Sequence, residues 1–218
     1  MTRRTRQWPV PAGLIALCLV PVVAGSVRLA ELSGGGPVRP ENARFFAMPV
    51  PVVLHIVTAT VFCLLGAFQF VPSLRRRPWH RLAGRVLVPC GLVAAVTGLW
   101  MTVLYPEPPG DGPLLYAFRL VFGTAMVAAL VLGLRAVRRR EFAVHRAWMM
   151  RGYAIGIGAG TQAVVTALWL VPFGTPDETT RALLLGAGWV INLAVVEWRL
   201  TRTPSTGRGT KTKELFPA

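Results

Sequence analysis

Residues 138–160 read RRREFAVHRAWMMRGYAIGIGAG, and this stretch decides the fold. A triple arginine, a His-Arg pair and a further arginine lead into an apolar run without charge. A basic loop of this kind is typical of the cytoplasmic border of a transmembrane helix. The whole chain is 53% apolar and 15% charged, with a formal net charge of +15. This composition indicates a protein embedded in lipid rather than a soluble domain.

Five other segments are apolar over the roughly 20 residues that a hydrocarbon core of about 30 Å requires. The sequence therefore predicts an all-α, polytopic integral membrane bundle of six transmembrane helices. They lie near residues 10–27, 50–71, 83–105, 114–134, 148–171 and 182–198. We expect one transmembrane domain over residues 1–203 and a disordered cytoplasmic tail over residues 204–218, which are rich in Thr, Gly and Lys.

The charge distribution predicts the orientation of this bundle. With both termini in the cytoplasm (N-in, C-in), 19 of the 24 lysines and arginines lie on the cytoplasmic side, as the positive-inside rule requires. The first apolar segment has an alternative interpretation as a signal peptide, because MTRRTRQW is a basic start and VVAGS offers small residues for cleavage. Cleavage would leave five spans and put the basic tail on the opposite side, so we favour six spans.

Two predicted spans carry glycines on a single helical face, at about 100° per residue. Such small residues let neighbouring helix backbones approach closely within a membrane. The helix-packing candidates are Gly84, Gly91 and Gly98 in the third span and Gly152, Gly156 and Gly160 in the fifth. His80 and His145 share these faces, so we expect both imidazoles to point at neighbouring helices.

Polar groups inside a membrane are costly and are functional candidates by default. The candidate ligand or functional residues are His55, Gln69, His80 and His145. The loops RRRPWHR and RRREFAVHR are similar, and their parallel placement predicts His80 and His145 at one level, where they are able to ligate a b-type haem. The neighbouring arginines then bind either its propionates or lipid phosphate; they are Arg81, Arg85, Arg146 and Arg151.

A haem-binding or redox-linked membrane protein is therefore the leading hypothesis. A small-solute or proton transporter that uses His55, and a non-catalytic scaffold, are the alternatives. No nucleophile elbow, phosphate loop or HExxH motif points to a classical enzyme. The short basic loops predict the bilayer and its anionic headgroups as partners and argue against nucleic acid, while homo-oligomerisation stays open. Three cysteines without paired spacing predict no disulfide framework and no metal site.

The motifs LGAFQF, PWHRLAGRV and HRAWMMRGYA, together with His55, resemble the bacterial predicted membrane proteins grouped as domain of unknown function 2306. The resemblance covers about residues 50–200. It implies a multi-span protein of the bacterial cell membrane and names no reaction. The positions that match the family's pattern are His55, Gly66, Gln69, His80, Arg81, Gly84, Arg85, His145, Arg146, Trp148, Met149 and Arg151.

Overall fold

A computed structural model describes residues 8–75 and 78–202, so the tail predicted at 204–218 lies outside the described residues. Every regular element in those two ranges is a helix, which confirms the all-α class. In chain order they are α1 (Pro9–Gly34), α2 (Ala43–Ala47), α3 (Pro49–Phe68), α4 (Pro72–Arg75), α5 (Pro78–Leu104), α6 (Pro113–Arg138), α7 (Phe142–Gly156), α8 (Gly158–Phe173) and α9 (Glu178–Thr201).

Five of these helices, α1, α3, α5, α6 and α9, are each long and apolar enough to cross a membrane. The pair α7 and α8 meets the same test together, which gives up to six candidate spans if this bent pair is one of them. Many large apolar side chains on these helices are exposed, including Val20, Val57, Val96 and Val121. Exposed aliphatic side chains are what a helix presents to lipid, since the bilayer interior is as apolar as they are. The membrane bundle is thereby confirmed.

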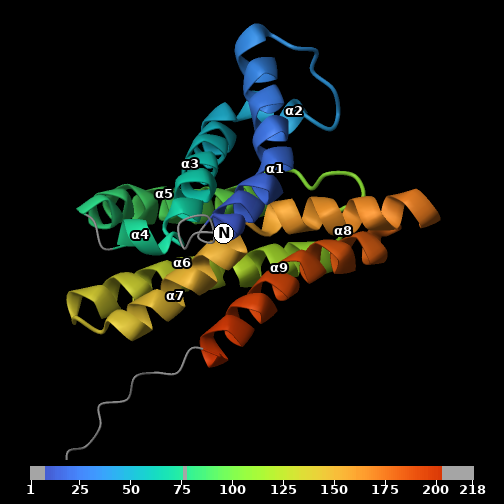
Figure 1. Cartoon of the computed structure of the whole chain (residues 1–218). Coiled ribbons are helices and arrows are strands. Elements are labelled where there is room, and N and C mark those ends of the chain that lie inside the picture. Colours follow the sequence, from blue (N-terminus) through green and yellow to red (C-terminus); the bar gives the residue numbers. More distant parts are fainter. Residues whose placement is uncertain (1–7, 76–77, 203–218) are drawn as a thin grey trace, which may run out of the picture.

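The helices that pack most extensively are neighbours in the chain. Figure 1 shows α6 and α7 side by side, and α8 and α9 side by side, while α3 lies between α1 and α5. The first helix also reaches α8, where the backbone carbonyl of Leu17 comes close to Gly160. As a result α1 is packed against two separate parts of the bundle.

Two side chains, Phe62 of α3 and Leu130 of α6, fill the space that glycines leave in the core. A methyl group on Gly91 would overlap both of them. A methyl on Gly156 would overlap Phe62, and one on Gly152 would press on Leu130. The glycine faces of α5 and α7 therefore meet through side chains of α3 and α6. Gly84 has no neighbouring atom within 4 Å of an added methyl, so the structure does not place it at such a contact.

The predicted continuous helix over residues 148–171 is wrong in one respect, because it is bent by 45° at Ile157. A break frees carbonyl groups, which in lipid must find other partners. The Ala154 carbonyl accepts a hydrogen bond from Asn192 Nδ2 at 3.0 Å. The Gly156 carbonyl accepts one from the Cys63 thiol at 3.5 Å. Side chains of α3 and α9 thus stabilise a break that glycine-rich sequence alone makes easy.

Candidate functional site

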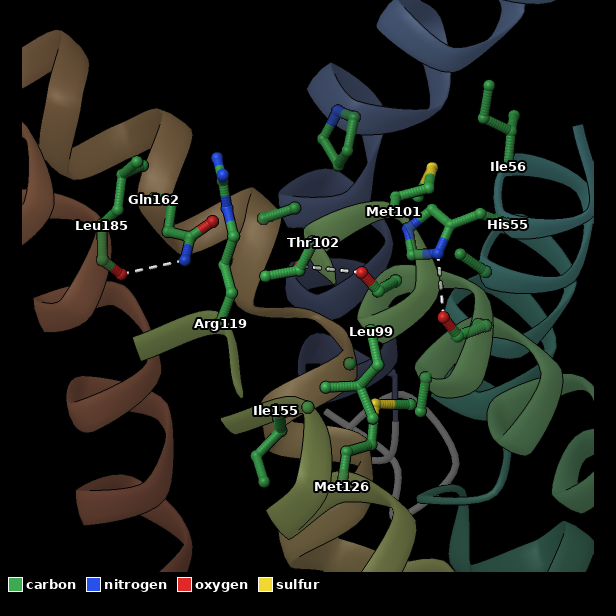
Figure 2. A pocket seen from close by; sticks show the side chains of 18 of the residues that line it. His55, Ile56, Leu99, Met101, Thr102, Arg119, Met126, Ile155, Gln162 and Leu185 are labelled. Atoms are coloured by element: carbon green, nitrogen blue, oxygen red, sulfur yellow. Dashed lines mark hydrogen bonds between the residues drawn. The ribbon is translucent and has the colours of Figure 1, made fainter. Parts of the chain in front are cut away.

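A cavity of about 560 Å³ lies between α1, α3, α5, α6 and α8 (Figure 2). The end of the cavity next to the loop after α5, which we call its mouth, is lined by Arg44, Tyr105 and Arg119. Its walls are mainly aliphatic and aromatic, and its deep end is lined by Cys18 and Met126 among others. Cavities of this size and character are typical of small-molecule sites in proteins.

His55 lines this cavity from α3, one and a half turns into the helix. Its Nδ1 lies 2.9 Å from the carbonyl oxygen of Ala94, and a carbonyl only accepts, so Nδ1 carries the proton. Nε2 of the neutral ring is then left with its lone pair. Gly98 provides the room for the ring, since an added methyl would lie 3.4 Å from His55 Cε1. Figure 2 shows the imidazole beside Met101 at the cavity wall.

A buried carboxylate organises the cations at one side of the mouth. The Asp111 side chain is 1% exposed and pairs with Arg119 at 2.6 Å and with Arg181 at 3.0 Å. Two arginines thus share one acid, and a local excess of positive charge remains. Glu107, which is exposed, is the acid among the described residues that line the cavity.

Arg44 adds a further cation, which α2 holds above the cavity. Its guanidinium stacks over the Phe45 ring at 4.7 Å, and it donates a long hydrogen bond of 3.4 Å to the Pro106 carbonyl. Among the described residues no carboxylate lies within 4.0 Å of it. Burial lowers the pKa of Arg44; Asp111 opposes this shift, while Arg119 adds to it. A cation whose charged form is disfavoured in this way is stabilised by an added anion.

Two more polar groups complete the lining. The Tyr105 hydroxyl donates to the Met48 carbonyl at 2.5 Å, and burial raises the pKa of this phenol. Gln162 of α8 donates from Nε2 to the Leu185 carbonyl at 2.9 Å. Figure 2 shows its amide oxygen turned toward the side of the cavity where Arg119 lies. The site therefore combines guanidinium donors, an imidazole lone pair and an apolar interior.

The structure brings only one of the four predicted functional residues to this cavity. His55 lines it, whereas Gln69 caps the opposite end of α3 and His80 lies in the first turn of α5. His145 of α7 has its Nδ1 2.8 Å from the Gly133 carbonyl, which leaves Nε2 as the one ring nitrogen open to a ligand. His80 and His145 therefore lie near the end of the bundle opposite to the loop after α5, in the first turns of α5 and α7.

The four predicted anion- or lipid-binding arginines also lie near that end of the bundle. Arg81, Arg85 and Arg146 are exposed there. Arg151 forms a two-pronged ion pair with Glu197, at 2.6 Å from Nε and 2.9 Å from Nη2, and stacks on the Trp148 ring at 4.9 Å. Its guanidinium is therefore already engaged within the protein.

Sequence reasoning did not select the cations of the mouth as a site. Arg119 is recognisable as a charge within a predicted span, at a level similar to that of His55. Arg44 lies in a loop, and only the fold of α2 against Tyr105 shows that it covers the cavity. The same connection also carries Arg28 and Arg39 beside Glu31 and Glu41, so its sequence does not distinguish Arg44 from the other arginines.

Comparison with known proteins gives one result. Residues 52–200 match the family described as predicted membrane protein (DUF2306). Neither a curated protein nor a solved structure matches the chain. The matched region begins within α3 and ends near the close of α9, so it includes His55 and most of the cavity wall.

Proposed function

The chain belongs to the DUF2306 family of predicted membrane proteins, and we propose that it binds a small amphiphile with an anionic head through the cavity below Arg44 and Arg119. One observation carries the proposal: two arginines that line the mouth of an apolar cavity about 560 Å³ in volume. A carboxylate or phosphate group would lie between the guanidinium groups. Its hydrocarbon body would extend toward Phe62 and Met126.

The charges at the mouth favour an anion over a neutral head. Asp111 is already shared by Arg119 and Arg181, and Glu107 is exposed to solvent. Arg44 contacts an aromatic ring and a carbonyl instead of an acid. A planar guanidinium fork matches carboxylate and phosphate oxygens, and such charge-assisted hydrogen bonds are the strong ones.

The deeper part of the cavity favours an apolar body. Leu99, Met126 and Ile155 line it, as Figure 2 shows, and the charged side chains among the described lining residues are those of Arg44, Glu107 and Arg119. In the neutral ring that carries its proton on Nδ1, His55 Nε2 is a hydrogen-bond acceptor. A hydroxyl or protonated acid on the ligand would satisfy that lone pair, and this gives His55 a positioning role next to the head group.

Native mass spectrometry of the purified chain in detergent tests the proposal with dodecanoate, dodecyl phosphate and dodecanol. We expect the two anions to bind and the alcohol to bind at least tenfold more weakly. Arg44→Gln should weaken the anions about tenfold to a hundredfold, the range that a lost hydrogen bond to a charged group represents. The exposed Arg81→Gln at the other border is the matched control and should change nothing. Equal binding of alcohol and acid, or equal losses in both variants, would refute the proposal.

A transporter is the second candidate, and the bend at Ile157 is the observation that favours it. Broken helices beside a binding site are a recurrent element of secondary transporters, and Ile157 and Gly160 both line the cavity. Flux of the bound amphiphile into proteoliposomes, compared with His55→Ala, is the test. Binding without flux would contradict transport and leave amphiphile binding as the function.

The b-type haem proposal concerns the opposite border of the membrane. An absorbance spectrum of the chain expressed with haem, oxidised and then reduced with dithionite, tests it directly. A Soret band lost in His80→Ala and in His145→Ala would support bis-histidine ligation. A spectrum without that band would end the haem proposal and leave amphiphile binding untouched.

A further inference from the structure

Two thiols from different helices meet at the deep end of the cavity. Cys18 of α1 and Cys63 of α3 are far apart in the sequence, yet both belong to one cluster of buried core residues. They are buried, with 1% and 9% of their surface exposed, and both line the cavity. We propose that Cys18 and Cys63 form a redox-active dithiol, which a membrane quinone oxidises to a disulfide.

The backbones that carry the two thiols approach closely. Helices α1 and α3 pack along one another, and an added methyl on Gly25 would overlap Ile56, two turns from the thiols. A disulfide needs Cα atoms about 4.4–6.8 Å apart and Cβ atoms about 3.5–4.5 Å apart. Cys18 and Cys63 are each seven residues from the Gly25–Ile56 contact, so the antiparallel pairing of α1 and α3 puts the two thiols at the same level of the helix pair.

The overall step balances with a quinone as the oxidant. Both S–H bonds break and one S–S bond forms, so the two thiols lose two protons and two electrons. The quinone takes both pairs, and its two carbonyl oxygens become the hydroxyl groups of a quinol. The product disulfide is neutral and apolar, which suits a site that is shielded from water. A lipid-soluble oxidant is the appropriate class because the thiols are buried below the membrane border.

Oxidation would also change the bend between α7 and α8. The Cys63 thiol donates a hydrogen bond to the Gly156 carbonyl at 3.5 Å, next to the break at Ile157. A disulfide has no S–H group, so that carbonyl would lose its donor. The redox state of the pair is therefore coupled to the α7–α8 break as well as to the attachment of α1.

The test incubates the full chain in nanodiscs with duroquinone, whose ring positions are all substituted, in the absence of oxygen. The protein is then denatured, alkylated with N-ethylmaleimide and analysed by mass spectrometry. We expect one equivalent of quinol, a cross-linked peptide that joins Cys18 to Cys63, and complete alkylation of Cys90. Cys18→Ser and Cys63→Ser should each abolish both the cross-link and the quinol, whereas Cys90→Ser, the matched control outside the cavity lining, should abolish neither.

Several outcomes would overturn the inference. One is alkylation of all three thiols after quinone treatment, and another is a cross-link that includes Cys90. Quinol formation that persists in Cys18→Ser would show a different electron donor. Loss of α1 from the mature chain would remove Cys18 altogether. Binding of dodecanoate to the reduced chain requires no disulfide, and formation of the disulfide requires neither Arg44 nor Arg119, so the two proposals fail separately.

Discussion

Gly98 gives the most direct test of how the cavity is built. An added methyl would lie 3.4 Å from His55 Cε1 and 3.6 Å from Nδ1, just at the edge of ordinary contact distances of about 3.5–4.0 Å. Gly98→Ala therefore costs little, and the higher helix propensity of alanine offsets the cost by about 1 kcal/mol. We expect this variant to be within about 1 kcal/mol of the natural protein.

Gly98→Val should behave differently because its γ carbons extend one bond, about 1.5 Å, beyond that methyl. The ring must then move by on the order of 1 Å, which carries Nδ1 beyond hydrogen-bonding distance of Ala94. The lost hydrogen bond of about 1 kcal/mol and overpacking of about 1–3 kcal/mol predict a destabilisation of about 2–4 kcal/mol. Dodecanoate binding should weaken as well, because the ring moves into the cavity.

The same helix offers a matched control. An added methyl on Gly84 meets nothing within 4 Å, so Gly84→Val should be neutral within about 0.5 kcal/mol. The free energy of unfolding is measured in detergent by adding sodium dodecyl sulfate and following tryptophan fluorescence. It is compared for the four variants with Ala or Val at Gly84 or Gly98. If Gly84→Val lost as much stability as Gly98→Val, general helix effects would explain the result and the steric argument would be refuted.

Three further predictions concern buried or capping polar groups. Tyr153→Phe removes the hydroxyl that donates to the Cys63 carbonyl at 2.7 Å, so it should cost about 1 kcal/mol in the same unfolding assay; an unchanged transition would contradict this. Asp111→Asn leaves two partly exposed arginines without their acid, and we expect a loss of about 1–2 kcal/mol that Asp111→Glu partly restores. Asp177 caps α9, where the Thr180 backbone N–H donates to it at 2.7 Å and lowers its pKa. The stabilisation is thus present above the ordinary aspartate pKa of about 3.9 and is lost as the pH falls through the lower folded value. Amide exchange at Thr180 should accelerate in that acid range, and Asp177→Ala should show fast exchange at every pH.

The arrangement of spans was predictable because hydrophobic length is a local property. Each segment of about 20 apolar residues can be recognised as a candidate span from its own composition. The family motifs lie in or next to these segments. The bend at Ile157 was not predictable in this way. It depends on Asn192 and Cys63, which come from other helices and provide hydrogen bonds for the freed carbonyls. A single helical segment carries no information on whether such partners exist.

The site was partly predictable for a similar reason. His55 stands out as a titratable group within an apolar segment, and its sequence position alone marks it as a candidate. The contribution of Arg44 depends on how a loop folds over Tyr105, and the clustering of Cys18 with Cys63 depends on how α1 lies along α3. The expectation of three isolated thiols rested on spacing within the chain, which does not report contacts between helices.

The proposed amphiphile site combines residues inside the family match with residues of the first helix, which lies outside it. The family match begins at residue 52, whereas Cys18, Pro21 and Val22 of α1 line the cavity from outside the matched region. The matched region therefore contains His55 and the space at Gly98. The side of the cavity formed by α1 lies outside that region. Replacing α1 with another apolar helix should change which hydrocarbon bodies fit in the cavity, while the position of the head group stays the same. Ligand selectivity can then evolve in α1 without any change in the motifs by which the family is recognised.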